Sequence, residues 1–76
     1  MQLEIKTKKN KDLTIVTTIG EIDDYHAPKL NDLLNTIIEN GALKLILNLE
    51  ETSYLDSVGL GTIAIAAKKI NKNNGK

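Results

Sequence analysis

The stretch APKLNDLLNTIIENGALKLILNL, residues 27–49, places a helix directly before a strand and decides the fold. Pro28 favours the first helical turn, where its missing N–H would have no partner in any case. Asn40-Gly41 supplies the left-handed residue that commonly ends a helix. The residues between them repeat at helical spacing: Leu30, Leu33, Leu34, Ile37 and Ile38. After the turn, Leu43 to Leu49 alternates as a strand, with every second residue a leucine.

Two shorter alternating stretches precede this unit. Leu3–Lys8 and Leu13–Ile19 have the period of strands, and the polar residues 9–12 between them suit a turn. They predict an antiparallel hairpin whose first strand, rich in lysine, lies at a sheet edge. Residues 20–24 are expected to break the second strand.

The order strand, helix, strand makes a crossover unit, in which the second and third strands are parallel. The second strand has one largely apolar face, with Leu13, Ile15 and Ile19, and one mixed face, with Val16 between two threonines. Only one face of the third strand is fully apolar. A sheet covered on both faces would be apolar on both, so the pattern predicts helices packed on one face.

Residues 50–56 are expected to form a loop, and Ser57–Asn71 a second helix with a narrow apolar stripe. Its expected buried residues are Leu60, Ile63, Ala64, Ala67 and Ile70. The polar residues 71–76 close the sequence, whereas a helix after a third strand normally leads to a fourth. The prediction is an α/β domain over residues 1–76, with a mixed sheet in the order β-β-α-β-α.

Composition excludes several functions. The 76 residues carry ten basic and ten acidic side chains, so no net field attracts nucleic acid or an acidic membrane. No apolar run approaches the length of a membrane span, and the N-terminus lacks the features of a signal peptide. Cysteine is absent, which excludes disulfides and thiolate metal sites. We expect a cytoplasmic protein without nucleic-acid or membrane partners.

The hexapeptide Asp56-Ser57-Val58-Gly59-Leu60-Gly61 marks the start of the second helix. The hydroxyl of Ser57 falls at or next to the helix cap, before backbone N–H groups that have no partner within the helix. A phosphate is well accommodated there, and the glycines leave bare backbone that a partner protein can approach. The simpler alternatives are that Ser57 or Asp56 only caps the helix, and that Asp23 and Asp24 form a solvated turn.

The sequence gives less support to an enzymatic function. Residues 59–64 fit the letters of a dinucleotide fingerprint, but they do not follow directly on a strand. His26 lies at a helix entrance without a nucleophile elbow, and we expect it to be a surface residue. Three aspartates are too few to indicate a metal site. The sequence therefore predicts no catalytic residues, no metal and no cofactor.

Four stretches in this order and spacing resemble the STAS domain family, and within it the bacterial anti-sigma factor antagonists. They are Gly20-Glu21-Ile22-Asp23, residues 25–30, residues 45–49 and residues 53–61. The resemblance implies a mixed sheet with helices on one side. It also implies a fourth strand and a further helix that this sequence does not contain, so the chain is expected to be one C-terminally short STAS domain.

The resemblance implies a partner switch. In the family, the serine after the motif aspartate is the phosphoacceptor, which here is Ser57, and an anti-sigma factor that is also a serine kinase phosphorylates it. The unphosphorylated form binds that anti-sigma factor and releases a sigma factor, and a phosphatase resets the switch. Asp23 matches the acidic residue beside the phosphoacceptor. Val58 stands where many members carry a second Ser or Thr.

The expected partner-binding residues are therefore Asp23, Asp56, Ser57, Val58, Gly59, Leu60 and Gly61. One alternative is a STAS domain that serves as a scaffold in a stress-signalling assembly or a transporter, without a phosphorylation switch. Another is an enzyme or nucleotide binder, which a nucleotide titration tests.

Overall fold

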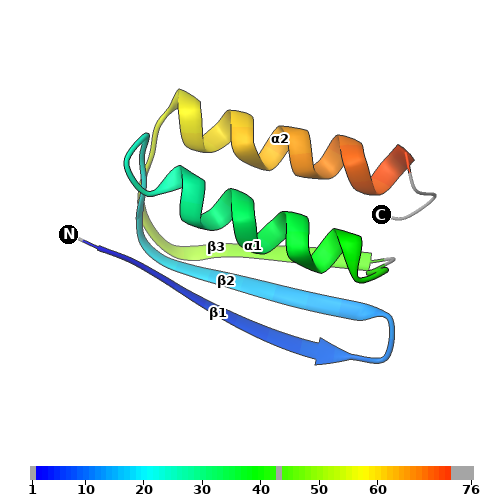
Figure 1. Ribbon diagram of the computed structural model, residues 1–76. Coiled ribbons are helices and arrows are strands. Elements are labelled where there is room, and N and C mark those ends of the chain that lie inside the picture. Colours follow the sequence, from blue (N-terminus) through cyan, green and yellow to red (C-terminus); the bar gives the residue numbers. More distant parts are fainter. Residues whose placement is uncertain (1, 43, 73–76) are drawn as a thin grey trace.

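The computed structural model describes residues 2–42 and 44–72, which form a three-stranded sheet and two helices (Figure 1). The elements are β1 (Leu3–Asn10), β2 (Leu13–Ile22), α1 (Ala27–Glu39), β3 (Lys44–Leu55) and α2 (Ser57–Lys72). The sheet order is β1-β2-β3, with β1 antiparallel and β3 parallel to β2, as predicted. The expected positions of Leu43 in the third strand and of residues 73–76 in a polar end lie outside the described residues.

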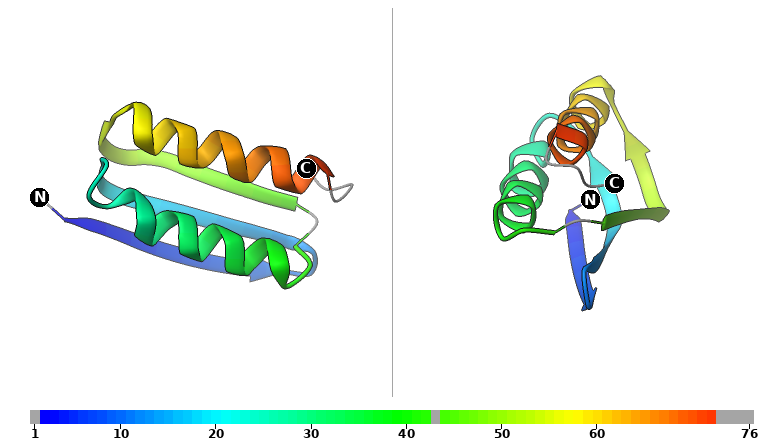
Figure 2. Two further views of the ribbon diagram at one scale, coloured as in Figure 1. Left: turned by 45° about the horizontal axis from the view of Figure 1, so that its top comes forward. Right: turned by 90° about the vertical axis from the view of Figure 1, so that its right-hand side faces the viewer.

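Both helices cover the same face of the sheet (Figure 2), which confirms the prediction of one-sided packing. The helix α1 begins at Ala27 with Pro28 in its first turn. It ends at the C-cap Asn40, followed by Gly41 with a φ of 90°. Its buried residues are Ala27, Leu30, Leu34 and Ile38.

The buried face of β2 is the one that mixes Val16 with threonines, and not the largely apolar one. Val16 and Thr18 are fully buried beneath the helices, whereas Ile15 and Ile19 lie on the open face and are half-buried. The interior accepts Thr18 because its hydroxyl makes a hydrogen bond of 2.6 Å with the hydroxyl of Thr52 on β3. A buried hydroxyl with a partner avoids the desolvation cost that makes polar residues rare in cores.

Both parallel strands are longer than expected. Gly20, which has a φ of 107°, lies within β2, and the strand continues to Ile22. Residues 50–56 were expected to be a loop, but β3 continues to Leu55. Glu51, Thr52, Tyr54 and Leu55 pair with residues 19–22 of β2. The pairing shifts register between Thr17 and Ile19 and again after Gly20, and such irregularities bend a strand without ending it.

The buried stripe of α2 differs from the prediction. Gly59, Ala66 and Ile70 are buried and Ile63 packs against the core, while Leu60, Ala64 and Ala67 are exposed. The first turn of α2 lies directly against the end of β2, and this contact fixes the rotation of the helix about its axis. Within residues 2–42 and 44–72, no helix is long and apolar enough to cross a membrane.

Candidate functional site

Two junctions, β2–α1 and β3–α2, meet at one end of the molecule (Figure 1). The link between them is Asp56, the residue between β3 and α2. Its backbone N–H donates to the carbonyl of Ile22 at 3.3 Å, and its Oδ2 accepts the backbone N–H of Asp24 at 3.1 Å. The structure thus brings together acidic residues that are more than thirty positions apart in the sequence.

Asp56 is also the N-cap of α2. Its Oδ1 accepts the N–H of Gly59 at 2.9 Å, and its carbonyl accepts the N–H of Leu60 at 2.9 Å. This is the bonding of an acidic N-cap residue. Because Asp56 caps the helix, Ser57 is the first helical residue and its hydroxyl is not needed for capping.

Ser57 is exposed at the start of α2. The N–H groups of Ser57 and Val58 precede the first intrahelical bonds, and the positive end of the helix dipole lies beside them. This position can accept a phosphate on the Ser57 hydroxyl.

The two glycines of the hexapeptide differ in how much space surrounds them. Gly59 is buried, and a Cβ atom there would lie 2.5 Å from the carbonyl oxygen of Ile22 and 2.9 Å from Leu55 Cδ1. The expectation that Gly59 offers bare backbone to a partner is corrected, because its missing side chain lets α2 pack against β2. A Cβ at Gly61 would meet nothing within 4 Å, so this glycine leaves space open.

Asp23 and His26 form a pair that the sequence analysis missed. Asp23 Oδ1 accepts the backbone N–H of His26 at 2.9 Å and lies 2.7 Å from the ring Nδ1. The backbone N–H of His26, and to a lesser extent its ring, hold the pKa of Asp23 below its ordinary value. With 16% of its side chain exposed, His26 is half-buried and is not the surface residue that was expected. The Asp-x-x-His spacing at a helix entrance is the local signal for the pair.

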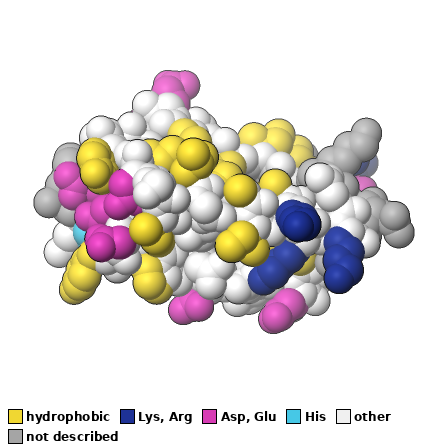
Figure 3. Space-filling model, turned by 90° about the horizontal axis from the view of Figure 1, so that it is seen from above, with side chains coloured by type: hydrophobic (Ala, Val, Ile, Leu, Met, Phe, Trp, Pro, Cys, Tyr) yellow, Lys and Arg dark blue, Asp and Glu magenta, His cyan; other side chains and the backbone are white. Residues whose placement is uncertain are grey.

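Exposed apolar side chains surround this acidic end. Val58 is 49% and Leu60 57% exposed, and Tyr25 stands 82% exposed beside His26. A hollow of about 320 Å³ between the first halves of α1 and α2 is lined by residues that include Asp24, Pro28, Val58 and Ile65. In Figure 3 a cluster of acidic side chains lies at one end of this face and lysines lie toward the other, with apolar side chains along the length between them. Pro28 and Ile65 are additions to the site, since only the folding of α1 against α2 brings them together.

Among the described residues, no group of three or more His, Cys, Asp or Glu side chains is arranged to hold a metal ion. Fold and site together define a small mixed α/β domain that presents an exposed serine at a helix N-terminus, framed by carboxylates and apolar side chains. Such a surface suits reversible binding of another protein.

The STAS domain family matches residues 4–76, and the chain belongs to this family. It is 35% identical over 74 residues to the anti-sigma-B factor antagonist of Staphylococcus aureus, covering 97% of this chain and 68% of that protein.

Two solved structures are also similar. An anti-sigma factor antagonist from Mycobacterium paratuberculosis matches with a TM-score of 0.88 and 26% identity, over 97% of this chain and 63% of that one. The Bacillus cell fate determinant SpoIIAA in its phosphorylated form matches with a TM-score of 0.81 and 22% identity, over 95% of this chain and 67% of that one. The last likeness concerns the fold alone. This chain therefore spans about two thirds of the length of these proteins.

Proposed function

We propose that this chain is an anti-sigma factor antagonist controlled by phosphorylation of Ser57. The unphosphorylated form binds an anti-sigma factor that is also a serine kinase, and a sigma factor is released. Phosphorylation of Ser57 ends the binding, and a serine phosphatase restores it. The observation that carries the proposal is the exposed Ser57, which the Asp56 cap leaves available at the start of α2. The role is that of a non-catalytic regulator in the cytoplasm, where sigma factors act.

The proposed partner surface comprises Ser57, Val58, Leu60 and Gly61, together with the carboxylates of Asp23 and Asp56. The hollow between Pro28 and Ile65 continues this surface with apolar side chains. Gly59 is buried under this surface and does not contact the partner. Its close packing against Ile22 sets the position of the exposed residues on either side of it.

The switch follows from charge. A phosphoserine brings about 1.5 to 2 negative charges, which the N–H groups and dipole at the start of α2 favour. The fold of the domain should therefore not change. In a complex the same charges, next to Asp56 and Asp24, would be forced into a dry interface at a cost of several kcal/mol. Since each ~1.4 kcal/mol is a factor of ten, binding would fall by a hundredfold or more.

The proposal is tested by the intact mass of the protein after incubation with ATP and the anti-sigma kinase encoded in the same genome. We expect one added phosphate on the wild type and none on Ser57→Ala. Thr36→Ala is the matched control, because Thr36 is a helical hydroxyl on α1, outside the proposed partner surface, whose Oγ1 donates to the Asp32 carbonyl at 2.9 Å. This variant should gain one phosphate.

Phosphate that persists on Ser57→Ala would place the acceptor elsewhere and refute the assignment. No phosphate on any variant would favour the alternative of a STAS scaffold that is not switched. Ser57→Asp separates binding from phosphorylation: it should weaken kinase binding while the circular dichroism spectrum stays the same.

A further inference from the structure

Tyr25 is the most exposed large apolar side chain within residues 2–42 and 44–72, at 82%. It is one of two tyrosines in a chain without phenylalanine or tryptophan, and the buried core is aliphatic. The fold therefore does not use this ring in its interior. Single exposed apolar side chains are common on protein surfaces, so exposure alone indicates no function. The role of Tyr25 has to be judged from the way it is held and from its neighbours.

The backbone on both sides of Tyr25 is fixed by hydrogen bonds. Before it, the N–H of Asp24 donates to Asp56 Oδ2 at 3.1 Å. After it, the N–H of His26 donates to Asp23 Oδ1 at 2.9 Å. Connecting segments are usually the more mobile parts of a domain. This one is tied to the cap of α2 and to the start of α1, so Tyr25 stands on a rigid base.

The ring of Tyr25 is supported as well. It lies edge-on to the ring of His26, with the ring centroids 5.0 Å apart and the planes at 87° to each other, which is a favourable arrangement. The His26 ring is held in turn, because its Nδ1 lies 2.7 Å from Asp23 Oδ1. A side chain that is already ordered loses little freedom when a partner immobilises it. Tyr25 thus has the properties of a preorganised binding anchor.

Tyr25 adjoins the surface that carries Ser57. Asp24 and Asp56 share a hydrogen bond, and Tyr25 and Ser57 are the residues that follow them in the chain. The hollow between α1 and α2 begins at the same place, because Asp24 and Ala27 belong to its lining. The exposed ring, the hollow and the exposed serine therefore meet at one end of the molecule.

The surroundings of the ring indicate what binds it. The carboxylates of Asp23, Asp24 and Asp56 lie in the same junction, so an acidic membrane or a nucleic acid would be repelled. Tyrosine is enriched among the residues that carry most of the energy of protein–protein binding, where it fills a pocket that excludes water. The ring of Tyr25 projects from this chain, so such a pocket belongs to a partner protein.

We infer that Tyr25 anchors the complex with the anti-sigma kinase by entering an apolar pocket on that partner, and that His26 is the positioning residue that fixes the ring. The inference rests on the proposed function, since it concerns the same partner. It separates two tasks on one surface, because Tyr25 supplies affinity and Ser57 supplies control. The kinase has to bind before it phosphorylates, so Tyr25 also determines how well Ser57 serves as a substrate.

The affinity for the kinase, measured by calorimetry in the absence of ATP, tests the anchor. Tyr25→Ala removes the ring and should weaken binding roughly thirtyfold or more, with an unchanged circular dichroism spectrum. Tyr25→Phe keeps the ring and should bind at least about tenfold more tightly than Tyr25→Ala.

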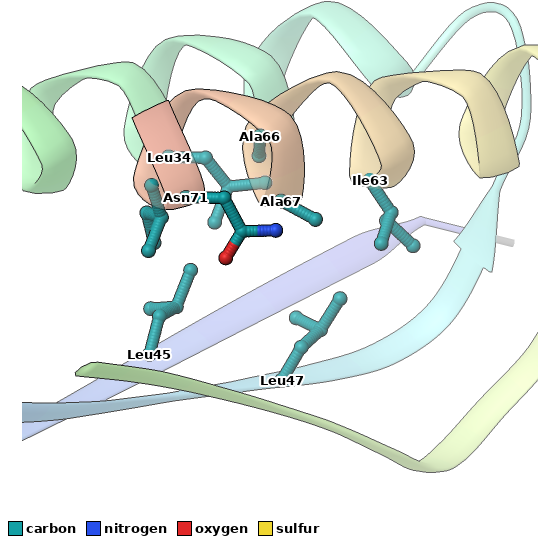
Figure 4. A pocket seen from close by; sticks show the side chains of 8 residues that line it. Leu34, Leu45, Leu47, Ile63, Ala66, Ala67 and Asn71 are labelled. Carbon is teal, nitrogen blue, oxygen red and sulfur yellow. The ribbon is translucent and has the colours of Figure 1, made fainter. Parts of the chain in front are cut away.

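Ile46→Ala is the control, because it truncates another exposed apolar side chain. Figure 4 shows Leu45 and Leu47 pointing from β3 toward the helices. Side chains alternate along a strand, so Ile46 points to the opposite face of the sheet, where it is 49% exposed. This variant should bind the kinase as the wild type does.

The kinetics of Ser57 phosphorylation give a second measurement. An anchor remote from the reacting hydroxyl acts equally in the ground state and the transition state, so its loss raises KM and leaves kcat unchanged. Tyr25→Ala should therefore raise the KM for this chain and still reach the wild-type kcat.

A double-mutant cycle tests the part assigned to His26. His26→Ala removes the ring that supports Tyr25, so it should weaken binding about threefold or more when Tyr25 is present and have no effect in the Tyr25→Ala background. Equal losses in both backgrounds would show that His26 does not act through Tyr25 and would refute its positioning role.

Two results would overturn the anchor while the proposed function stands. The first is equal affinity of the wild type and Tyr25→Ala. The second is a loss in Tyr25→Phe as large as that in Tyr25→Ala, because the hydroxyl and not the ring would then make the contact. A wild-type protein that neither binds the kinase nor gains phosphate would instead refute the proposed function, and the anchor with it.

Discussion

Replacement of Gly59 by alanine should destabilise the domain, although alanine is the better helix former. The new Cβ would lie 2.5 Å from the carbonyl oxygen of Ile22 and 2.7 Å from Ile22 Cγ2. These contacts are about 1 Å shorter than the optimum for nonbonded atoms. The carbonyl belongs to β2 and cannot rotate away, so the start of α2 has to move.

The expected loss follows from two opposing effects. Overpacking of this kind costs about 1–3 kcal/mol, and the Gly to Ala change in a helix returns up to ~1 kcal/mol. A net loss of about 1–2 kcal/mol remains, which lowers the melting temperature of a domain of this size by roughly 5–15 °C.

Gly61→Ala is the matched control. It lies two residues further along the same helix, and its new Cβ would meet nothing within 4 Å. Only the helix propensity then applies, so this variant should be stabilised by up to ~1 kcal/mol. Urea denaturation followed by circular dichroism at 222 nm measures both variants. Shifts of the same sign for Gly59→Ala and Gly61→Ala would refute the packing argument.

Two further predictions concern the acidic residues of the site. Asp56→Ala removes the cap of α2 and the bond to the Asp24 N–H, so it should lower the free energy of unfolding by about 1 kcal/mol. Asp56→Asn, which keeps an oxygen, should lose less, and equal losses in urea denaturation would contradict the capping role. The pKa of Asp23 is lowered in the folded state by its bonds to His26. The ionised Asp23 therefore stabilises the fold at a pH above 3.8, the ordinary pKa of an aspartate. This stabilisation is lost as the pH falls through the lower pKa that Asp23 has in the folded state. Asp23→Asn should remove this part of the acid dependence, and an unchanged profile of stability between pH 5 and about 2 would contradict it.

Local signals predicted the parts of the fold that depend on neighbouring residues. Pro28 and Gly41 bound α1 correctly, and the alternation before and after residues 9–12 gave the hairpin. The same is true of Ser57, whose position at the start of α2 follows from the residues around it.

The remaining features depend on contacts between distant residues. Thr18 belongs to the core because Thr52, 34 positions later, supplies the partner for its hydroxyl. The rotation of α2 depends on the fit of Gly59 against Ile22, and the length of β3 on its pairing with the end of β2. The hollow between Pro28 and Ile65 exists only once α1 and α2 are packed together. The Asp23–His26 pair is different, because its spacing is local and could have been found in the sequence.

The central claim is that a phosphate on Ser57 controls the binding of an anti-sigma factor. The most direct test is the dissociation constant for the anti-sigma kinase of the same genome, measured by calorimetry with the unphosphorylated and the Ser57-phosphorylated protein. We predict binding by the unphosphorylated form and a loss of at least a hundredfold on phosphorylation, with the same circular dichroism spectrum for both. Equal affinities of the two forms would contradict the account.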